Sequence, residues 1–510
     1  MGTWQRVKDH FKTFEITIDE NGQTHKTPIP RPKVPNPWHV VRLLNWKHWV
    51  YFLVGFAAWT MDGYDFHTVS LSVSRLAEFY GKPRADISQS ITFTLLFRSV
   101  GAAVFGMAGD MYGRKWPLFV NLMIIAVLQV GTAYADSFKV FLAVRSLFGI
   151  AMGGIWGLAA SMSLENMPVE ARGLFSGILQ QGYALGYLIG AVFNLTVVPH
   201  SPHSFRALFY IGAALTALVA CTRLFFPESQ QFLEAKRNRQ NGSHAAAFMK
   251  DAKKVLRMHW RRCLYAVVLM SGFNFMSHTS QDMYPTYMQQ GKGFSASKAT
   301  LATLIAKVGA LIGGTIGGYY SQFWGRRLTI IVSCVLGICF IPLWVLPTGL
   351  APLIMGSFFV EGFVQAAWGV VPVHLAELSP PAFRAAFPGI TYQLGNMISS
   401  PAAQILTTVA ESLKKQVTVN GVRVERPDYG TTQAIMMAII FTWVAIWAAI
   451  GKEERGAHFE LAAAAGSGEG EIGKGIVEMQ EGRATPTEVM DLEKKGGAEH
   501  VENVAAEQRR

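Results

Sequence analysis

The sequence predicts an all-α membrane protein of twelve transmembrane helices, arranged as two six-helix pseudo-repeats. Three observations lead to this fold class. Half of the 510 residues are hydrophobic and only 16% are charged, whereas soluble chains carry about 25% charged residues. The charges collect near the two ends and in one central segment, and the apolar runs between them reach about 20 residues, enough to cross a hydrocarbon core. The chain also repeats itself at a constant offset.

Twelve apolar runs set the expected domain organisation. We expect a cytoplasmic N-terminal segment (1–47), a six-helix bundle (48–226), a basic cytoplasmic linker (227–262), a second six-helix bundle (263–450) and a disordered cytoplasmic tail (451–510) that is poor in aromatic residues. The span cores are expected at 48–74, 88–111, 117–134, 140–162, 174–196, 206–226, 264–288, 297–323, 328–346, 352–375, 386–409 and 431–450.

Positive charge sets the expected orientation, because basic loops stay on the cytoplasmic side of a membrane. The linker is rich in Lys and Arg between Lys236 and Arg262, and the short turns Gly113–Lys115 and Gly325–Arg327 are basic too. Both termini are therefore expected to be cytoplasmic. Since the basic residues flank apolar spans, the partner they indicate is the lipid bilayer, and no nucleic-acid partner is expected.

The repeat is visible in residues that recur 212 positions apart. Arg114 recurs as Arg326, and Trp156-Gly157 recurs as Trp368-Gly369. Further pairs are Glu165 and Glu377, Arg172 and Arg384, Gly177 and Gly389, and Gln181 and Gln393. Six helices have thus been duplicated. Parallel repeats of this kind enclose a substrate site at their interface in transporters.

Two loops carry a motif at the repeat offset. "GMAGDMYGRK" (106–115) and "GYYSQFWGRR" (318–327) resemble the G-x-x-x-D-x-x-G-R-K/R loop motif of the major facilitator superfamily, with Gln322 in place of the second Asp. Arg and Asp beside a tight glycine turn pair with helix ends, which closes the cytoplasmic side; the plainer alternative is a basic turn that only sets topology. The expected gating residues are Gly106, Asp110, Gly113, Arg114, Gly325 and Arg326.

A polar stripe interrupts the seventh span, in "NFMSHTSQDMYPT" (274–286). At about 100° per residue, one face of the helix carries five of its polar side chains: Asn274, Ser277, His278, Gln281 and Asp282. Such groups are costly in lipid, about 2.5–3.5 kcal/mol for a charge at the helix centre, so the stripe faces the bundle interior. It could form an interhelical hydrogen-bond seam, but so many polar groups on one face favour a substrate path.

The same stretch resembles the seventh-span motif of the fungal Jen carboxylate permeases, N-x-x-[S/T]-H-x-[S/T]-Q-D-x-x-x-T. Those proteins are proton-coupled lactate and pyruvate transporters with dicarboxylate-preferring relatives. The resemblance implies a plasma-membrane symporter of a small carboxylate and a proton. All specified positions are filled, by Asn274, Ser277, His278, Ser280, Gln281, Asp282 and Thr286. Apart from Asp282, they are expected to bind substrate.

The first span carries a related motif, "WTMDGYDFHTVS" (59–70), in which Asp62 lies at the repeat position of Asn274. It resembles the D-G-F-D-F motif of proton-coupled sialate and carboxylate carriers, with Tyr64 in place of the first Phe. Asp62 is therefore a candidate for proton coupling. A polar network at the outer end of the helix is the alternative.

Three basic residues lie inside apolar spans: Arg98, Arg145 and Lys307. Arg98 is the expected carboxylate clamp, since a guanidinium matches a carboxylate with two hydrogen bonds. It would otherwise serve in an ion pair with a nearby aspartate. Arg145 is expected to be a proton-coupling or structural residue, while Lys307 either belongs to the site, snorkels or pairs with Glu361.

Asp282 is the first candidate for the proton. An anion bound at Arg98 would partly neutralise that arginine and let Asp282 hold a proton more tightly. His278 would relay the proton or donate a hydrogen bond to the substrate. The repeat-related Gln181 and Gln393 are expected to contact the rest of the substrate.

Several alternatives remain open at this point. The substrate is a monocarboxylate, a dicarboxylate such as succinate or malate, or a sialate. A carboxylate sensor that moves no substrate would have the same fold, with the tail as its output; the tail lysines would also suit ubiquitin and the endocytic machinery. We find no nucleophile–base pair, metal cluster or phosphate loop, so an enzyme, a metal or a cofactor is not expected.

Overall fold

The computed structural model describes residues 14–18, 24–28, 36–228, 244–380, 383–419 and 422–453. More than half of the predicted N-terminal segment, part of the linker and nearly all of the predicted tail, with all of its lysines except Lys452, lie outside the described residues. Two short antiparallel hairpins are present, one of β1 (Phe14–Ile18) with β2 (Thr24–Pro28) and one of β3 (Lys414–Val419) with β4 (Val422–Pro427).

The first bundle follows a short helix, α2 (Pro37–Arg42), and contains the predicted first six spans. Its helices are α3 (Trp46–Tyr80), α4 (Arg84–Tyr112), α5 (Lys115–Ala133), α6 (Phe138–Gly153), α7 (Ile155–Glu165), α8 (Val169–Gln180), α9 (Gly182–Thr196) and α10 (Arg206–Leu224), with a 3₁₀ turn, η1 (Val198–His200), after α9.

The second bundle begins with α12 (His244–Gln281), which starts inside the predicted linker and has non-helical backbone at His259. It continues with α13 (Tyr284–Thr286), a π-helical turn η2 (Tyr287–Gly291), α14 (Ala296–Trp324), α15 (Arg326–Val345), α16 (Leu350–Trp368), α17 (Val371–Leu378), α18 (Ala386–Ser399), α19 (Ala402–Ser412) and α20 (Tyr429–Ile450).

Within the described ranges, nine helices are long and apolar enough to cross a membrane. The other three predicted spans are helical as well: α3, the second part of α12, and α18 with α19. Each of these three spans buries several polar side chains. The predicted pattern of spans therefore agrees with the helices observed.

The helix boundaries differ from the predicted runs where the chain contains proline or glycine. The tenth and eleventh spans are each split, with Pro372 and Pro401 at the breaks, since proline cannot donate a backbone hydrogen bond. Gly154 divides the fourth span and Gln181 the fifth. The predicted seventh span runs to residue 288, but α12 ends at Gln281, just before Pro285.

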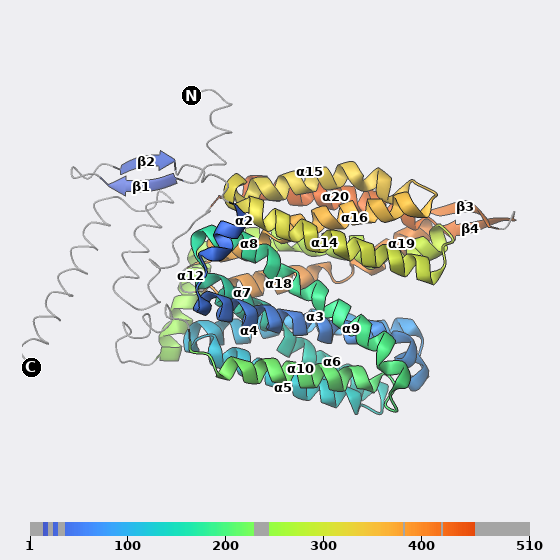
Figure 1. Cartoon of the computed structure of the whole chain (residues 1–510), viewed down its shortest axis with the longest axis horizontal. Coiled ribbons are helices and arrows are strands. Elements are labelled where there is room, and N and C mark those ends of the chain that lie inside the picture. Colours follow the sequence, from blue (N-terminus) through green and yellow to red (C-terminus); the bar gives the residue numbers. More distant parts are fainter. Residues whose placement is uncertain are drawn as a thin grey trace, which may run out of the picture.

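The two bundles lie side by side along one axis (Figure 1), with α14, α15, α16 and α20 in the upper part of the view and α3, α4, α5 and α10 in the lower part. One end of the molecule carries the turns 113–115 and 325–327 and is called the turn end. The opposite end carries the β3–β4 hairpin and is called the hairpin end. One continuous apolar core joins the bundles, and it includes Trp59, Trp156 and Trp368.

The duplication is preserved in three dimensions at the turn end. Arg114 bonds Glu165 at 2.8 Å, and the repeat-related Arg326 bonds both oxygens of Glu377 at 2.9 Å. Gly113 and Gly325 have φ values of 93° and 101°, which only glycine adopts readily. Each turn can therefore reverse the chain directly between two helices.

At the turn end the two bundles are in contact through Asp110. Its carboxylate accepts hydrogen bonds from the backbone N–H groups of Ala385 and Ala386, at 3.0 and 2.9 Å, where α18 begins. Next to it, a Cβ added to Gly106 would lie 2.8 Å from Ala386 Cα. A negative charge at a helix N-terminus is favourable, so these contacts join the two bundles at the turn end.

The second copy of the motif makes a different set of contacts. Gln322, which replaces the aspartate, accepts a hydrogen bond from Arg326 of its own bundle at 2.8 Å. Closure across the second bundle relies on small residues instead: Ser176 donates to the carbonyl of Gly369 at 2.7 Å and accepts from the N–H of Val373. The two halves of the gate are thus built differently.

We predict that Asp110→Asn opens the turn end. The change removes the charge from two charge-assisted hydrogen bonds, each of which contributes about 1.5–3 kcal/mol. Spin labels at the exposed, repeat-related positions Tyr112 and Trp324 would report a larger population at long separation by double electron–electron resonance. Asp136→Asn is the matched control, because Asp136 is exposed at the hairpin end. An unchanged distance distribution in Asp110→Asn would contradict the assignment.

Candidate functional site

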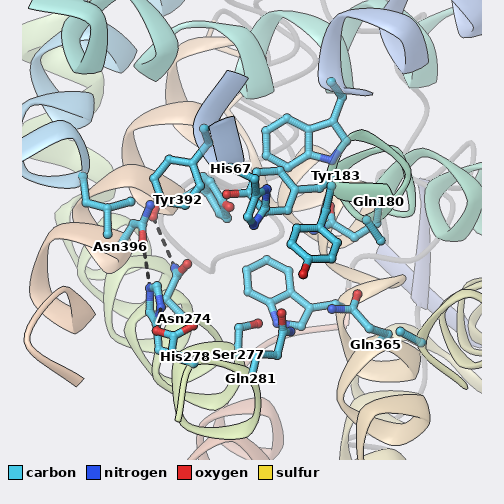
Figure 2. A pocket seen from close by; sticks show the side chains of 18 of the residues that line it. His67, Gln180, Tyr183, Asn274, Ser277, His278, Gln281, Gln365, Tyr392 and Asn396 are labelled. Atoms are coloured by element: carbon cyan, nitrogen blue, oxygen red, sulfur yellow. Dashed lines mark hydrogen bonds and ion pairs between the residues drawn. The ribbon is translucent and has the colours of Figure 1, made fainter. Parts of the chain in front are cut away.

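A pocket of about 110 Å³ lies between the two bundles. It is lined by α3 and α12, whose spans carry the polar motifs found in the sequence, together with α4, α8, α9, α14, α16 and α18. In Figure 2, Asn396 and His278 lie on one side of the pocket and Gln180 and Gln365 on the other. The pocket therefore offers hydrogen-bonding groups from both bundles.

Solvent reaches the pocket from the hairpin end. Trp59, Arg98 and Trp368, which lie deeper, are 1–2% exposed, whereas the Asp282 side chain at the hairpin end of α12 is 42% exposed. His67 and Tyr187, also toward that end, are half-buried. Together with the contacts around Asp110, this gradient indicates that the hairpin end of the pocket is the more accessible end.

Arg98 lies at the floor of the pocket and forms a salt bridge with Asp62 through its Nη2. Both side chains are buried, at 1% and 0% exposure. The pair uses only part of each group: Nε of Arg98 and Oδ1 of Asp62 have no hydrogen-bond partner among the described residues. The guanidinium thus keeps one donor, Nε, that Asp62 does not satisfy.

The polar stripe of the seventh span faces the pocket as predicted, through Asn274, Ser277, His278 and Gln281 of α12 and Asp282 just beyond it. The His278 ring bonds Asp282 at 2.9 Å through Nδ1 and Asn396 at 3.3 Å through Nε2. These two hydrogen bonds connect the exposed carboxylate of Asp282 with α18, so α12 and α18 are linked at the mouth of the pocket.

Lys307 of α14 is a second cation in the pocket wall, and its amine donates to Oε1 of Gln281 at 2.5 Å. The repeat relates the position of Lys307 on α14 to a position on α4. In the lining, α4 presents Leu95 and Arg98, and α14 presents Lys307 and Ala310, which are the same two positions shifted by the repeat offset. Each bundle therefore contributes one cation to the lining. The two cations are not at equivalent positions of the repeat, because Lys307 corresponds to position 95, about one helical turn before Arg98.

Aromatic rings form much of the remaining wall, and the sequence did not indicate them as site residues. Trp59 stacks on Tyr183 at 5.0 Å between ring centroids, and Trp156 stacks on Tyr392 at 4.6 Å. The indole N–H groups of Trp59 and Trp368 have no acceptor within the described structure. The recurrence of Trp156 and Trp368 at the repeat offset was the one available signal. Other lining residues that were missed are His67, Gln180, Gln365 and Asn396.

Some predicted site residues lie outside the lining of this pocket. Ser280 is buried and donates to the carbonyl of Ser277, and Thr286 lies in α13 beyond the helix break. Gln181 and Gln393 are buried behind the wall; Gln181 packs against Gly314, and Gln393 accepts from Asn396 at 3.3 Å. The neighbour Gln180 occupies the place expected for Gln181, because the helix breaks between α8 and α9.

Arg145 and Asp65 belong to a separate buried network within the first bundle. Asp65 accepts from Gln129 at 2.6 Å and from Thr216 at 2.8 Å. Arg145 donates to the same Gln129 at 3.5 Å and lies 3.8 Å from the Phe148 ring. The network joins α3, α5, α6 and α10, and it lies outside the pocket lining.

Known proteins match the chain in sequence and in structure. Residues 40–454 match the family described as sugar (and other) transporter. The chain is 34% identical to a carboxylic acid transporter protein homolog of Saccharomyces cerevisiae, over 82% of this chain and 70% of that one. It is 25% identical to the sialic acid transporter NanX of Escherichia coli, over 69% and 85%. The structure of XylE, a proton:xylose symporter of the major facilitator superfamily, matches with a TM-score of 0.62 at 17% identity, over 78% and 94%.

The Arg98–Asp62 pair predicts a strong coupling in stability. Asp62→Asn or Arg98→Gln alone leaves a buried charge without its partner, which costs about 3–5 kcal/mol. The double variant removes both charges and should recover part of that loss. The thermal unfolding midpoints of the purified variants in detergent complete the cycle. Simple addition of the two single losses would show that the pair is not coupled.

Proposed function

The chain belongs to the sugar (and other) transporter family of the major facilitator superfamily, and we propose that it is a proton-coupled plasma-membrane symporter of short-chain carboxylates such as lactate and pyruvate. The family and the fold agree with the resemblance found in the sequence, and they are those of multi-pass membrane transporters rather than enzymes. The turn end would face the cytoplasm, with both termini on that side.

One observation carries the proposal: a buried arginine with a free edge faces a pocket lined by amide and hydroxyl groups. Arg98 would bind the carboxylate of the substrate through the N–H groups that Asp62 leaves unused. Asn274, Ser277 and Gln281 would form hydrogen bonds with a 2-hydroxyl or 2-keto oxygen of the substrate. The relative named as a carboxylic acid transporter homolog supports the same substrate class.

Proton coupling would follow from competition for Arg98. When Asp62 is ionised, it holds the guanidinium; when it binds a proton, the guanidinium is released to the substrate anion. Loading one proton and one monocarboxylate then leaves the charge of the pocket unchanged. Asp282 and His278, at the mouth, would deliver the proton from the hairpin end, and Arg145 would support the first bundle during this exchange.

Release would require the two bundles to rock about the pocket. The contacts of Asp110 with α18 keep the turn end shut while the hairpin end is accessible. Once those contacts break, the pocket would open toward the turn end and the substrate and proton would leave there. A carboxylate sensor would bind the same anions but move none of them across the membrane.

Lys307 favours a second candidate, a dicarboxylate substrate. Arg98 and Lys307 come from repeat-related helices of opposite bundles and both line the pocket. Two cations facing one cavity from its two sides suit an anion with a carboxylate at each end, such as succinate or malate. Arg145, the other cation considered for this role, lies outside the lining of this pocket.

Flux through the purified protein in liposomes tests the proposed function. We predict that an inward proton gradient drives uptake of labelled lactate. Arg98→Gln should reduce uptake about ten- to a hundredfold, because charge-assisted hydrogen bonds contribute about 1.5–3 kcal/mol and 1.4 kcal/mol is tenfold. Arg75→Gln is the control, an arginine bonded to Asn194 away from the pocket. Binding of lactate without any flux would instead identify a sensor.

Competition separates the two substrate classes. If a dicarboxylate is the substrate, succinate and malate should compete with lactate better than pyruvate and acetate do. Lys307→Leu, which installs the residue of the repeat-related position 95, should then abolish the advantage of the dicarboxylates and leave lactate uptake in place. Equal loss of both classes would show that Lys307 serves the pocket in some other way.

A further inference from the structure

A buried carboxylate that the proposed mechanism does not use lies behind Lys307. Glu361 of α16 is 3% exposed. Both of its carboxylate oxygens lack a hydrogen-bond partner within the described residues. The hydroxyl of Ser280 lies close to it and donates to the carbonyl of Ser277 at 3.1 Å. An ionised carboxylate in such surroundings is strongly unfavourable, so it must be neutralised by a nearby cation or by a proton.

The packing of α14 against α16 places Glu361 toward Lys307. A Cβ added to Gly309 would lie 2.2 Å from the carbonyl oxygen of Phe358, and one added to Gly313 would lie 1.9 Å from that of Gly362. The two backbones are therefore in direct contact on both sides of Glu361. Close contact of this kind holds α14 beside the carboxylate, and Lys307 of α14 is the cation that acts on it.

The charged groups that act on Glu361 are Lys307 on α14 and Asp282 beyond α12. On α15, which also packs against α16, the basic residues are Arg326 and Arg327 in the first turn, at the turn end. Lys307 is thus the one cation, within the described part of the chain, that can reach Glu361 and also lines the pocket.

We propose that Glu361 is a second proton-binding group, coupled to the pocket through Lys307. The amine of Lys307 has two alternative anions, the carboxylate of Glu361 and an acid in the pocket. When Lys307 turns to the pocket, Glu361 loses its only close counter-charge and takes up a proton on a carboxylate oxygen. When the acid leaves, Lys307 returns and the proton is released.

The observed conformation fits the first of these two states. Lys307 donates to Gln281 in the pocket wall rather than to Glu361, and both Glu361 oxygens are without a hydrogen bond to any described residue. In this arrangement Lys307 is turned to the pocket and Glu361 is the group that would carry the proton, which is the state that the proposal assigns to the anion-bound pocket. The inference rests on the proposed function, because it needs an acid in the pocket, but it assigns a proton that the Arg98–Asp62 pair does not supply.

Proton uptake on binding measures this coupling directly. Isothermal titration calorimetry of the purified transporter, in buffers of different ionisation enthalpy, gives the number of protons bound with each lactate or succinate. We expect Glu361→Gln to lower that number by about one proton per anion that engages Lys307. Glu361→Asp should restore it, since a carboxylate is present again. Proton uptake that is the same in wild type and Glu361→Gln would overturn the proposal.

A second variant protects the test against misfolding of the first. Lys307→Gln removes the link, so Glu361 should stay protonated throughout and the same proton should be missing from the count. Asp62→Asn should remove a different proton, and the proton bound by Glu361 should still be taken up with the anion. If wild type binds neither acid, the proposed function fails; if it binds an acid and Lys307→Gln keeps the full proton count, only the role of Glu361 fails.

Discussion

The structure depends on pairing charged side chains inside an apolar bundle. A charge without a partner at this depth costs more than most packing interactions can offset, so each buried cation constrains the helices around it. Arg98 holds α4 to α3 through Asp62, and Arg114 and Arg326 hold the turns to the helix ends. The pocket is one region where hydrogen bonding is incomplete, with unsatisfied groups on Arg98, Trp59 and Trp368 among the described residues. In the proposed function, an anion would bind where the protein has placed donors that it does not itself satisfy.

Polar contacts also join the two bundles at the turn end. At the turn end the two bundles touch through backbone and small residues, with Asp110 at the start of α18 and Ser176 against Gly369. These polar contacts lie beside an apolar cluster that also crosses between the bundles and includes Phe175, Tyr319 and Phe323. Rocking of the bundles would have to break both kinds of contact.

Much of the fold could be predicted from the sequence, because membrane spans, the repeat and the gating motif depend on local composition. The seventh-span stripe was also found, since polar side chains at helical spacing are too costly to face lipid. What could not be found was the aromatic wall, because Trp59, Tyr183 and Tyr392 look like ordinary packing residues until their neighbours are known. Gln180 was missed in favour of Gln181 because a helix break shifts the face by one residue, and no sequence periodicity reports such a break.

The duplication supplies a symmetric scaffold, but several polar contacts at the turn end and around the pocket are made by residues that differ between the two halves. Asp110 faces α18 while its counterpart Gln322 bonds within its own bundle, and Asp62 pairs with Arg98 while its counterpart Asn274 donates to the backbone of Met270. The two cations of the pocket, Arg98 and Lys307, likewise lie about one helical turn apart when the two halves are compared. A symmetric pocket would hold two equivalent anions with equal ease and give no reason for a proton to accompany either. Asp62 lies beside Arg98 and Glu361 lies behind Lys307, so in the proposed mechanism each cation has a carboxylate of the protein that competes with the substrate anion for it. Competition of this kind can link the binding of an anion to the binding of a proton.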